Sequence, residues 1–440
     1  MTDGVSLEIA KRRQILELNG FSTAAMAGPG SSGADYLVPS LDFNSPIARR
    51  IADNAFGDLK DYPDAAGLMK DIETLSDTVE KEIEEVLRRY RPGFIFLHNV
   101  FSHGRHIASA GAFRKVLERY EIPVLATHHD FYWERDQYRY PSCSAVEKYL
   151  EKNIPPLIPG VRHAVINSLA AGELKRRTGI EAMVFPDTLD FKQKKWTADS
   201  WTADIAEDSG FRAEDIVVLQ ATRIVRRKGI ELMIPVLRSL NSDAYLGRLR
   251  GRTLYNGKRI TNRSRFFYLI AGYAEEDAGE YLKSLEILLE KEEIPHSFIG
   301  DRVAAQRSES GESRIYSLFD LYPRADIISY PSLYEGWGNQ FLEAVFAEKP
   351  VMVFEYPVFK SDIKGKGYSF ISLGDRVETD KENNLFLLPE DKVGNICHQV
   401  IETLINPDTS SLLKKNYLIG SEHNSYAVLE ELLSEGMKVS

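Results

Sequence analysis

Short apolar segments alternate with longer amphipathic segments along most of this 440-residue chain, and this alternation limits the folds open to it. Residues 76–90 and 109–120, for example, carry apolar side chains at the spacing of a helix face. Between such segments lie continuous apolar runs, which indicate strands buried on both faces. The predicted strands are residues 21–28, 35–43, 93–100, 123–130, 163–168, 182–191, 216–222, 265–272, 296–300, 325–332, 349–357 and 367–373. Further helices are predicted at residues 229–240, 279–293 and 339–348. Strands that alternate with helices in this way predict an α/β fold with parallel sheets.

The length of the chain predicts two domains, because one hydrophobic core rarely grows beyond about 250–300 residues. Residues 190–212 are polar, rich in Lys, Thr, Asp and Trp, and show no clear period. We therefore place the boundary in this stretch and predict two Rossmann-like domains, residues 1–195 and 196–420. In such a fold a ligand binds in a cleft beyond the carboxyl ends of the strands.

The start of the chain departs from this pattern. Residues 1–20 form a glycine-containing turn followed directly by a helical pattern, with no strand before it. A Rossmann-like domain normally enters such a turn from its first, central strand. We expect either that the coding sequence starts upstream of Met1 or that this fold lacks the strand, and we favour the first.

Charge and cysteine content argue against several classes of protein. A net charge of −10 disfavours nucleic acid as the main partner. The two cysteines, Cys143 and Cys397, fit neither a C-x-x-C motif nor a metal-ligand spacing, so a disulfide framework and a structural zinc site are disfavoured. No apolar run approaches the roughly 18 residues of a membrane span, and no signal peptide opens the chain. We expect a cytoplasmic protein without a transmembrane segment.

One glycine motif is a weak match to a dinucleotide-binding loop. Residues 28–33 read G-P-G-S-S-G, but a predicted strand follows them, whereas the dinucleotide motif must open a helix. We interpret them as a loop. The chain shows no P-loop, no G-x-S-x-G elbow and no Asp-x-Asp metal pair.

Polar residues follow two of the predicted strands. His128, His129 and Asp130 end the strand at 123–130, and they form either a hydrogen-bonded group in a loop or a polar surface that faces a sugar or phosphate. Arg223 and Lys228 lie between a strand and a helix. They form either a solvated basic loop or a clamp for a diphosphate, which the start of the helix would also favour.

The segment S-L-Y-E-G-W-G-N-Q-F-L-E-A-V-F, residues 332–346, places Glu335 and Glu343 on either side of a tight glycine turn. Gly336 and Gly338 permit a sharp turn that exposes backbone amides, and Asn339 is at the expected helix cap. The two acids could form the carboxylate pair of a glycosidase. Acids beside amide donors, however, suit a neutral polyol bound next to an anion, and we favour that interpretation.

The spacing of Glu335 and Glu343 resembles the E-x7-E motif of the family 4 retaining glycosyltransferases, which have the GT-B fold. Trp337 replaces the Phe that is usual in this motif. The resemblance covers essentially the whole chain, since further segments match the family in order: residues 2–8, 127–130, 185–191, 221–229 and 322–332. It also implies that residues 421–440 form a helix that crosses back to the first domain.

The resemblance implies a role for each candidate residue in binding a nucleotide-sugar donor. Arg223 and Lys228 would hold the diphosphate, Glu335 would contact the transferred sugar, and Glu343 would accept the ribose hydroxyls. The backbone of Gly336, Trp337, Gly338 and Asn339 would bind the sugar and phosphate. His129 would contact the sugar from the first domain, and Arg302 would lie on the base side. Asp3 and Gly4 would lie near the phosphate and the acceptor.

The resemblance also implies the reaction. A hexose would pass from UDP-glucose or GDP-mannose to a hydroxyl of the acceptor, with retention of anomeric configuration, no cofactor and no metal. Because the chain shows no basic amphipathic membrane segment near its start, we expect a small soluble acceptor. Two alternatives stay open: a nucleotide-sugar epimerase of the same fold, and, if the chain begins at Met1, an inactive nucleotide-sugar binder. The sequence predicts no particular oligomeric state.

Overall fold

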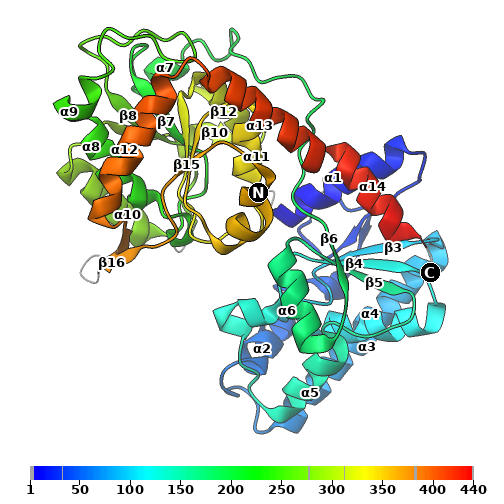
Figure 1. The fold of residues 1–440 in the computed structure, drawn as a ribbon. Helices are drawn as coiled ribbons and strands as arrows, with labels where there is room; N and C mark the ends of the chain where they lie inside the picture. Colours follow the sequence, from blue (N-terminus) through cyan, green and yellow to red (C-terminus); the bar gives the residue numbers. More distant parts are fainter. Residues whose placement is uncertain (1–3, 32, 276–277, 312, 381–383, 439–440) are drawn as a thin grey trace. The chain divides into compact units, whose positions relative to one another are not determined.

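A computed structural model of the chain describes residues 4–31, 33–275, 278–311, 313–380 and 384–438. The chain divides into two compact units (Figure 1). Unit 1 comprises residues 1–186 together with 427–440, and unit 2 comprises residues 187–426. No helix of the described part is long and apolar enough to cross a membrane.

Unit 1 is built on a parallel sheet with the strand order β3-β4-β5-β6. These strands are Ile95–His98, Val124–His128, Val161–Val165 and Ala182–Val184. A separate parallel pair is formed by β1 (Met26–Ala27) and β2 (Tyr36–Leu37), much shorter than the strands predicted there. Residues 28–31 and 33 lie in the loop between them, and in the described residues α1 (Gly4–Leu18) comes before any strand.

Helices cover both faces of this sheet because its side chains alternate between them. Val124 and Ala126 pack into the core formed with α3 and α4. On the other face, a Cβ at Gly436 of α14 would lie 2.8 Å from the Leu125 side chain, and Figure 1 shows α1 and α14 together on that side. The C-terminal helix thus packs on the sheet of unit 1. Besides α1, the helices of this unit are α2 (Pro46–Ala55), α3 (Ala65–Tyr90), α4 (Ile107–Tyr120), α5 (Ser144–Asn153), α6 (Ser168–Thr178) and α14 (Tyr426–Met437).

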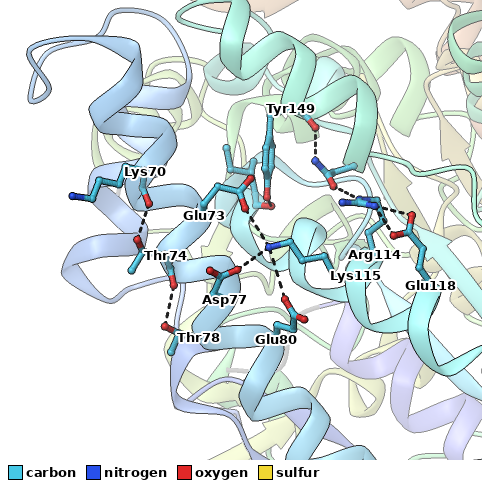
Figure 2. A network of polar contacts seen from close by, with 12 residues as sticks. Lys70, Glu73, Thr74, Asp77, Thr78, Glu80, Arg114, Lys115, Glu118 and Tyr149 are labelled. Atoms are coloured by element: carbon cyan, nitrogen blue, oxygen red, sulfur yellow. Dashed lines mark hydrogen bonds and ion pairs between the residues drawn. The ribbon is translucent and has the colours of Figure 1, made fainter.

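An ion-pair network fixes α4 against α3 (Figure 2). The Lys115 ammonium lies 3.2 Å from a carboxylate oxygen of Glu73, 2.8 Å from Asp77 and 3.8 Å from Glu80. These acids occupy one stripe of α3 within reach of Lys115, and Arg119 also pairs with Glu80 at 2.8 Å. A network of this kind stabilises more than an isolated surface pair does, and it lies on a helix surface rather than at the strand ends.

Unit 2 contains a six-stranded parallel sheet with the order β9-β8-β7-β13-β14-β15. Numbered along the chain, this is the order 3-2-1-4-5-6 of a dinucleotide-binding fold. The strands are β7 (Ile216–Gln220), β8 (Phe266–Ile270), β9 (His296–Phe298), β13 (Ile327–Tyr330), β14 (Val351–Val353) and β15 (Ile371–Ser372). In such a sheet the ligand site lies where the order reverses, between β7 and β13.

The remaining elements of unit 2 surround this sheet. The helices are α7 (Ile205–Asp208), α8 (Met233–Leu240), α9 (Asp243–Leu246), α10 (Gly279–Lys291), α11 (Asn339–Phe346), α12 (Glu390–Ile405) and α13 (Thr409–His423). Two small sheets are formed by β10 (Val303–Ala304), β11 (Ser308–Ser310) and β12 (Ser313–Ser317), and by β16 (Glu378–Asp380) and β17 (Leu385–Leu387).

The two ends of unit 2 lie next to each other. The Leu189 amide donates to the Asn424 carbonyl at 2.9 Å, and Leu189 forms a parallel bridge with Ser425. Unit 2 begins at residue 187, whereas the sequence placed the boundary at 195. The difference arises because Phe191 packs into the core of unit 2, with its ring 5.9 Å from that of Phe346.

Candidate functional site

The polar loops after β7 and β13 lie side by side in unit 2. The two strands are neighbours, with Ile327 paired to Val218 and Ile328 to Leu219. The Leu333 amide donates to the Arg227 carbonyl at 2.8 Å, which ties the two loops together. The strand order therefore brings residues from 223–228 and 335–339 to one place, although they are far apart in the sequence.

Two cations bind one carboxylate at this place. The Lys228 ammonium donates to Oε1 of Glu335, and Arg227 Nη1 donates to Oε2 at 2.9 Å. The Lys228 and Glu335 side chains are only 10% and 11% exposed. Arg227 also donates to the Tyr334 carbonyl at 3.2 Å, so its guanidinium is anchored at two points.

The charges of this cluster shift one another's pKa values. Burial acts to raise the pKa of Glu335, but the charges of Lys228 and Arg227 lower it below its ordinary value. Burial lowers the pKa of Lys228, against the opposing effect of Glu335, and the nearby charges of Arg227 and Arg223 lower it further. Glu335 is thus an ionised, nearly buried carboxylate.

The glycine turn after Glu335 has a conformation that only glycine adopts readily. Gly338 has φ +150°, and a Cβ there would lie 2.6 Å from the Tyr356 hydroxyl. Its amide donates to Asp187 Oδ2 at 3.1 Å, and the Tyr356 hydroxyl donates to the carbonyl of the buried Trp337. The prediction that Asn339 caps α11 is wrong: Gly338 is the cap, and Asn339 is the first helical residue. The extreme φ of Gly338 moves the turn one residue earlier.

Glu343 is held separately from Glu335. It lies within α11, and the buried Tyr322 hydroxyl donates to its Oε2 at 2.6 Å. Burial, followed by the charge of Glu343, raises the pKa of Tyr322 well above its ordinary value, so the phenol keeps its proton for this bond. The Trp196 ring lies 5.0 Å from Tyr322 and stacks on Phe319 at 4.4 Å, which places an aromatic surface close to Glu343.

The structure also places the two other arginines that the sequence predicts for the site in unit 2, Arg223 and Arg302. Arg223 forms an ion pair with Glu275 and is close enough to lower the pKa of Lys228. Arg302 pairs with Asp208 of α7 at 2.7 Å, and no ion pair between described residues joins it to Glu335.

In unit 1, His129 and its neighbours link the ends of two strands. His98 Nδ1 lies 3.1 Å from His129 Nε2, and the His129 amide donates to Asn99 Oδ1 at 2.8 Å. His128 instead points into the core and lies 2.9 Å from His163. The two adjacent histidines therefore differ, and the second one is at the strand-end surface. Gly4 opens α1 in this unit, whereas Asp3 lies outside the described residues.

The sequence does not single out three residues that the structure places at this site: Arg227, Tyr322 and Asp187. Arg227 is one of four cations in residues 223–228, and nothing in the local pattern distinguishes it from Arg226. Tyr322 and Asp187 lie in segments that match the family, but only the fold shows that they bind Glu343 and Gly338.

Comparison with known proteins identifies the family of the chain. Residues 202–367 match the sequence family described as glycosyl transferases group 1. The chain is 34% identical over 420 residues to the mannosylglucosylglycerate synthase of Petrotoga mobilis, covering 95% of this chain and 94% of the relative. It is also 34% identical to the mannosylglucosylglycerate synthase of Thermotoga maritima, over 99% of this chain and 96% of the relative. Among solved structures, sucrose-phosphate synthase from Thermosynechococcus elongatus superposes with a TM-score of 0.59 at 13% identity, covering 98% of this chain and 92% of the other. The chain therefore belongs to the group 1, family 4-type glycosyltransferases of the GT-B fold.

Proposed function

We propose that the protein transfers a mannosyl group from a nucleotide-diphosphate sugar to glucosylglycerate, with retention of anomeric configuration. The observation that carries the proposal is the similarity, along almost the whole chain, to two proteins named mannosylglucosylglycerate synthase. That name describes a product in which a mannosyl group is joined to glucosylglycerate. The proposal therefore specifies mannose as the transferred hexose and glucosylglycerate as the acceptor, where the sequence alone predicts only a hexose and a small soluble acceptor.

The cations after β7 suit the leaving group of this reaction. The bond between C1 of the sugar and the phosphate oxygen breaks, and its electron pair leaves with the nucleoside diphosphate. Lys228 and Arg223 would stabilise the charge that develops there, as positioned cations do at other phosphoryl leaving groups. The acceptor hydroxyl oxygen bonds to C1 on the same face, and its proton passes to the departing phosphate oxygen. We propose that protein cations perform this step without a metal.

The carboxylates suit the neutral parts of the donor. Glu335 is ionised and lies next to Lys228, and it would accept a hydrogen bond from a hydroxyl of the transferred sugar. Glu343 is oriented by the Tyr322 hydroxyl and would accept hydrogen bonds from the ribose hydroxyls. In this proposal the backbone of residues 336–339 and the side chain of Arg302 would also contact the donor, and His129 would contact the transferred sugar.

The experiment is a transfer assay with purified protein. Glucosylglycerate is supplied with GDP-mannose, UDP-mannose or UDP-glucose, and products are identified by mass spectrometry and by the anomeric coupling constant in NMR. We expect a mannosylated product with the donor's anomeric configuration, and unchanged rates after treatment with a chelator. An acceptor-independent change of the donor sugar would indicate an epimerase instead. Nucleotide binding without turnover of any donor would refute the proposal.

A further inference from the structure

Arg12 on α1 is a buried cation without an ion pair. Its side chain is 3% exposed, and Nη1 donates to the Thr127 hydroxyl at 2.6 Å. Its guanidinium lies over the Phe185 ring, 5.1 Å from the centroid, and Nε is buried with no hydrogen-bond partner. The carboxylate one turn earlier, Glu8, pairs with Lys11 at 2.6 Å instead. No ion pair between described residues joins Arg12 to a carboxylate, and the charge of Glu8 only partly offsets the effect of burial on the Arg12 pKa. Burying a charge without such a pair is costly.

This cation lies at the ends of two strands. Thr127 is next to the last residue of β4, and His98, the last residue of β3, pairs with it in register. Both His98 and His129 are half-buried, and their ring nitrogens are 3.1 Å apart. Burial lowers the pKa of His98 well below its ordinary value, and the positive charge of Arg12, with His129 and His128 nearby, lowers it further. The ends of β3 and β4 therefore hold a buried guanidinium with two imidazoles close by.

A carboxylate is the group that would complete the hydrogen bonds of Arg12, whose Nε has no partner. Burial lowers the pKa of Arg12 only to about 10, so the guanidinium stays charged at neutral pH. A guanidinium presents several N–H donors in a planar arrangement that matches the two oxygens of a carboxylate. The Thr127 hydroxyl and the His98 imidazole supply further polar contacts on the same side. Building on the proposed function, we propose that Arg12, Thr127 and His98 bind the carboxylate of the acceptor's glycerate group.

The test compares two acceptors that differ only in this charge. Glucosylglycerate carries the carboxylate, and glucosylglycerol carries a neutral hydroxymethyl group in its place. Because a hydrogen bond to a charged group is stronger than one to a neutral group, we expect the wild-type protein to favour the acid in kcat/KM on the order of 10- to 100-fold. Arg12→Gln is expected to remove most of this preference, because kcat/KM should fall much further for the acid than for the neutral acceptor.

The neighbouring arginine provides a matched control. Arg13 lies on the exposed side of α1, where it pairs with Glu17 at 2.8 Å and Asp35 at 2.9 Å. Arg13→Gln removes the same charge from the same helix and should leave the preference unchanged. Arg12→Lys should restore part of it, because the cation is kept and the planar arrangement is lost.

A binding measurement on the wild-type protein guards against misfolding of the variants. The imidazole signals are followed by NMR as glucosylglycerate or glucosylglycerol is added, and His98→Asn identifies the His98 signal. An anion beside His98 stabilises its protonated form, so the acid should raise the His98 pKa and the neutral compound should not.

The outcomes separate the two proposals. A wild-type protein that glycosylates neither acceptor refutes the proposed function, and the NMR titration then decides the carboxylate site by itself. Transfer with an acid preference that survives Arg12→Gln, or a His98 pKa that the acid leaves unchanged, would overturn the carboxylate site while leaving the transferase intact.

Discussion

At the scale of single residues, Glu335 depends on two cations at once. If Lys228 turns towards a leaving phosphate, Arg227 remains bound to Glu335 Oε2 at 2.9 Å and keeps the nearly buried carboxylate paired. Lys228 and Arg227 hold the pKa of Glu335 down, while the neighbouring Tyr330 and Tyr356 carry raised pKa values and stay neutral. Removing Arg227 should therefore raise the Glu335 pKa, so that its ionised form is lost at a higher pH.

We predict that Arg227→Gln lowers kcat/KM for the donor on the order of tenfold and moves the acid limb of the pH–rate profile upwards. The measurement is kcat/KM between pH 4 and 8. Arg226→Gln is the control, because Arg226 donates to the Asn384 carbonyl and has no ion pair with Glu335 in the described structure. Identical profiles for the two variants would contradict the role assigned to Arg227. The sequence predicts a basic cluster at residues 223–228. Which of these cations binds Glu335 depends on how the loops after β7 and β13, distant in the sequence, pack together.

At the scale of elements, the turn into α11 is fixed by one glycine. Gly338→Ala adds a Cβ at φ +150°, 2.6 Å from the Tyr356 hydroxyl, which is itself bound to the Trp337 carbonyl. We predict a loss of stability of about 1–3 kcal/mol and weaker nucleotide binding, because the turn must shift. Urea unfolding and calorimetric titration with GDP and UDP measure the two effects.

Gly279→Ala is the matched control for this change. Gly279 also begins a helix, α10, but a Cβ there meets nothing within 4 Å. Its substitution should be neutral or slightly stabilising. Equal losses from both variants would mean that the conformation of Gly338 is unimportant.

The elements themselves differed in how well the sequence predicted them. Strands such as β7 and β8 were predicted because residues 216–220 and 266–270 are buried along their whole length, which requires continuous apolar runs. The short β1 and β2 have only half-buried or exposed residues, and their local sequence does not determine where pairing stops. The sequence predicts Asn339 as the cap of α11 because Asn is a common cap residue, whereas the structure has Gly338 there. The backbone conformation of Gly338 cannot be read from the local sequence.

At the scale of the whole molecule, acid should destabilise the fold through unit 1. The pKa of His163 is lowered to about 4 by burial, and burial likewise lowers that of its partner His128. A histidine in the unfolded chain titrates near 6.5. Unfolding therefore takes up protons between about pH 6.5 and 4. The stability that the neutral pair provides is complete above pH 6.5 and is lost as the pH falls through this window.

For His163 alone, this loss amounts to about 2 kcal/mol at pH 5. We predict that urea unfolding of the full chain shows lower stability at pH 5 than at pH 7, and that His163→Gln reduces the difference. A difference that is the same in both proteins would contradict the prediction. The local pattern does not distinguish His128 from His129, and only the family resemblance selects His129. The pairing of β4 with β5 reveals that His128 is the one that meets His163.

The adjacent ends of unit 2 have a consequence for how the gene can be rearranged. Residues 187–426 are continuous in the chain, and the Leu189 amide meets the Asn424 carbonyl at 2.9 Å. A short peptide could therefore join the two ends of this unit, and new termini could be opened in an exposed loop on its surface. Unit 2 is thus, by its geometry, a candidate for circular permutation.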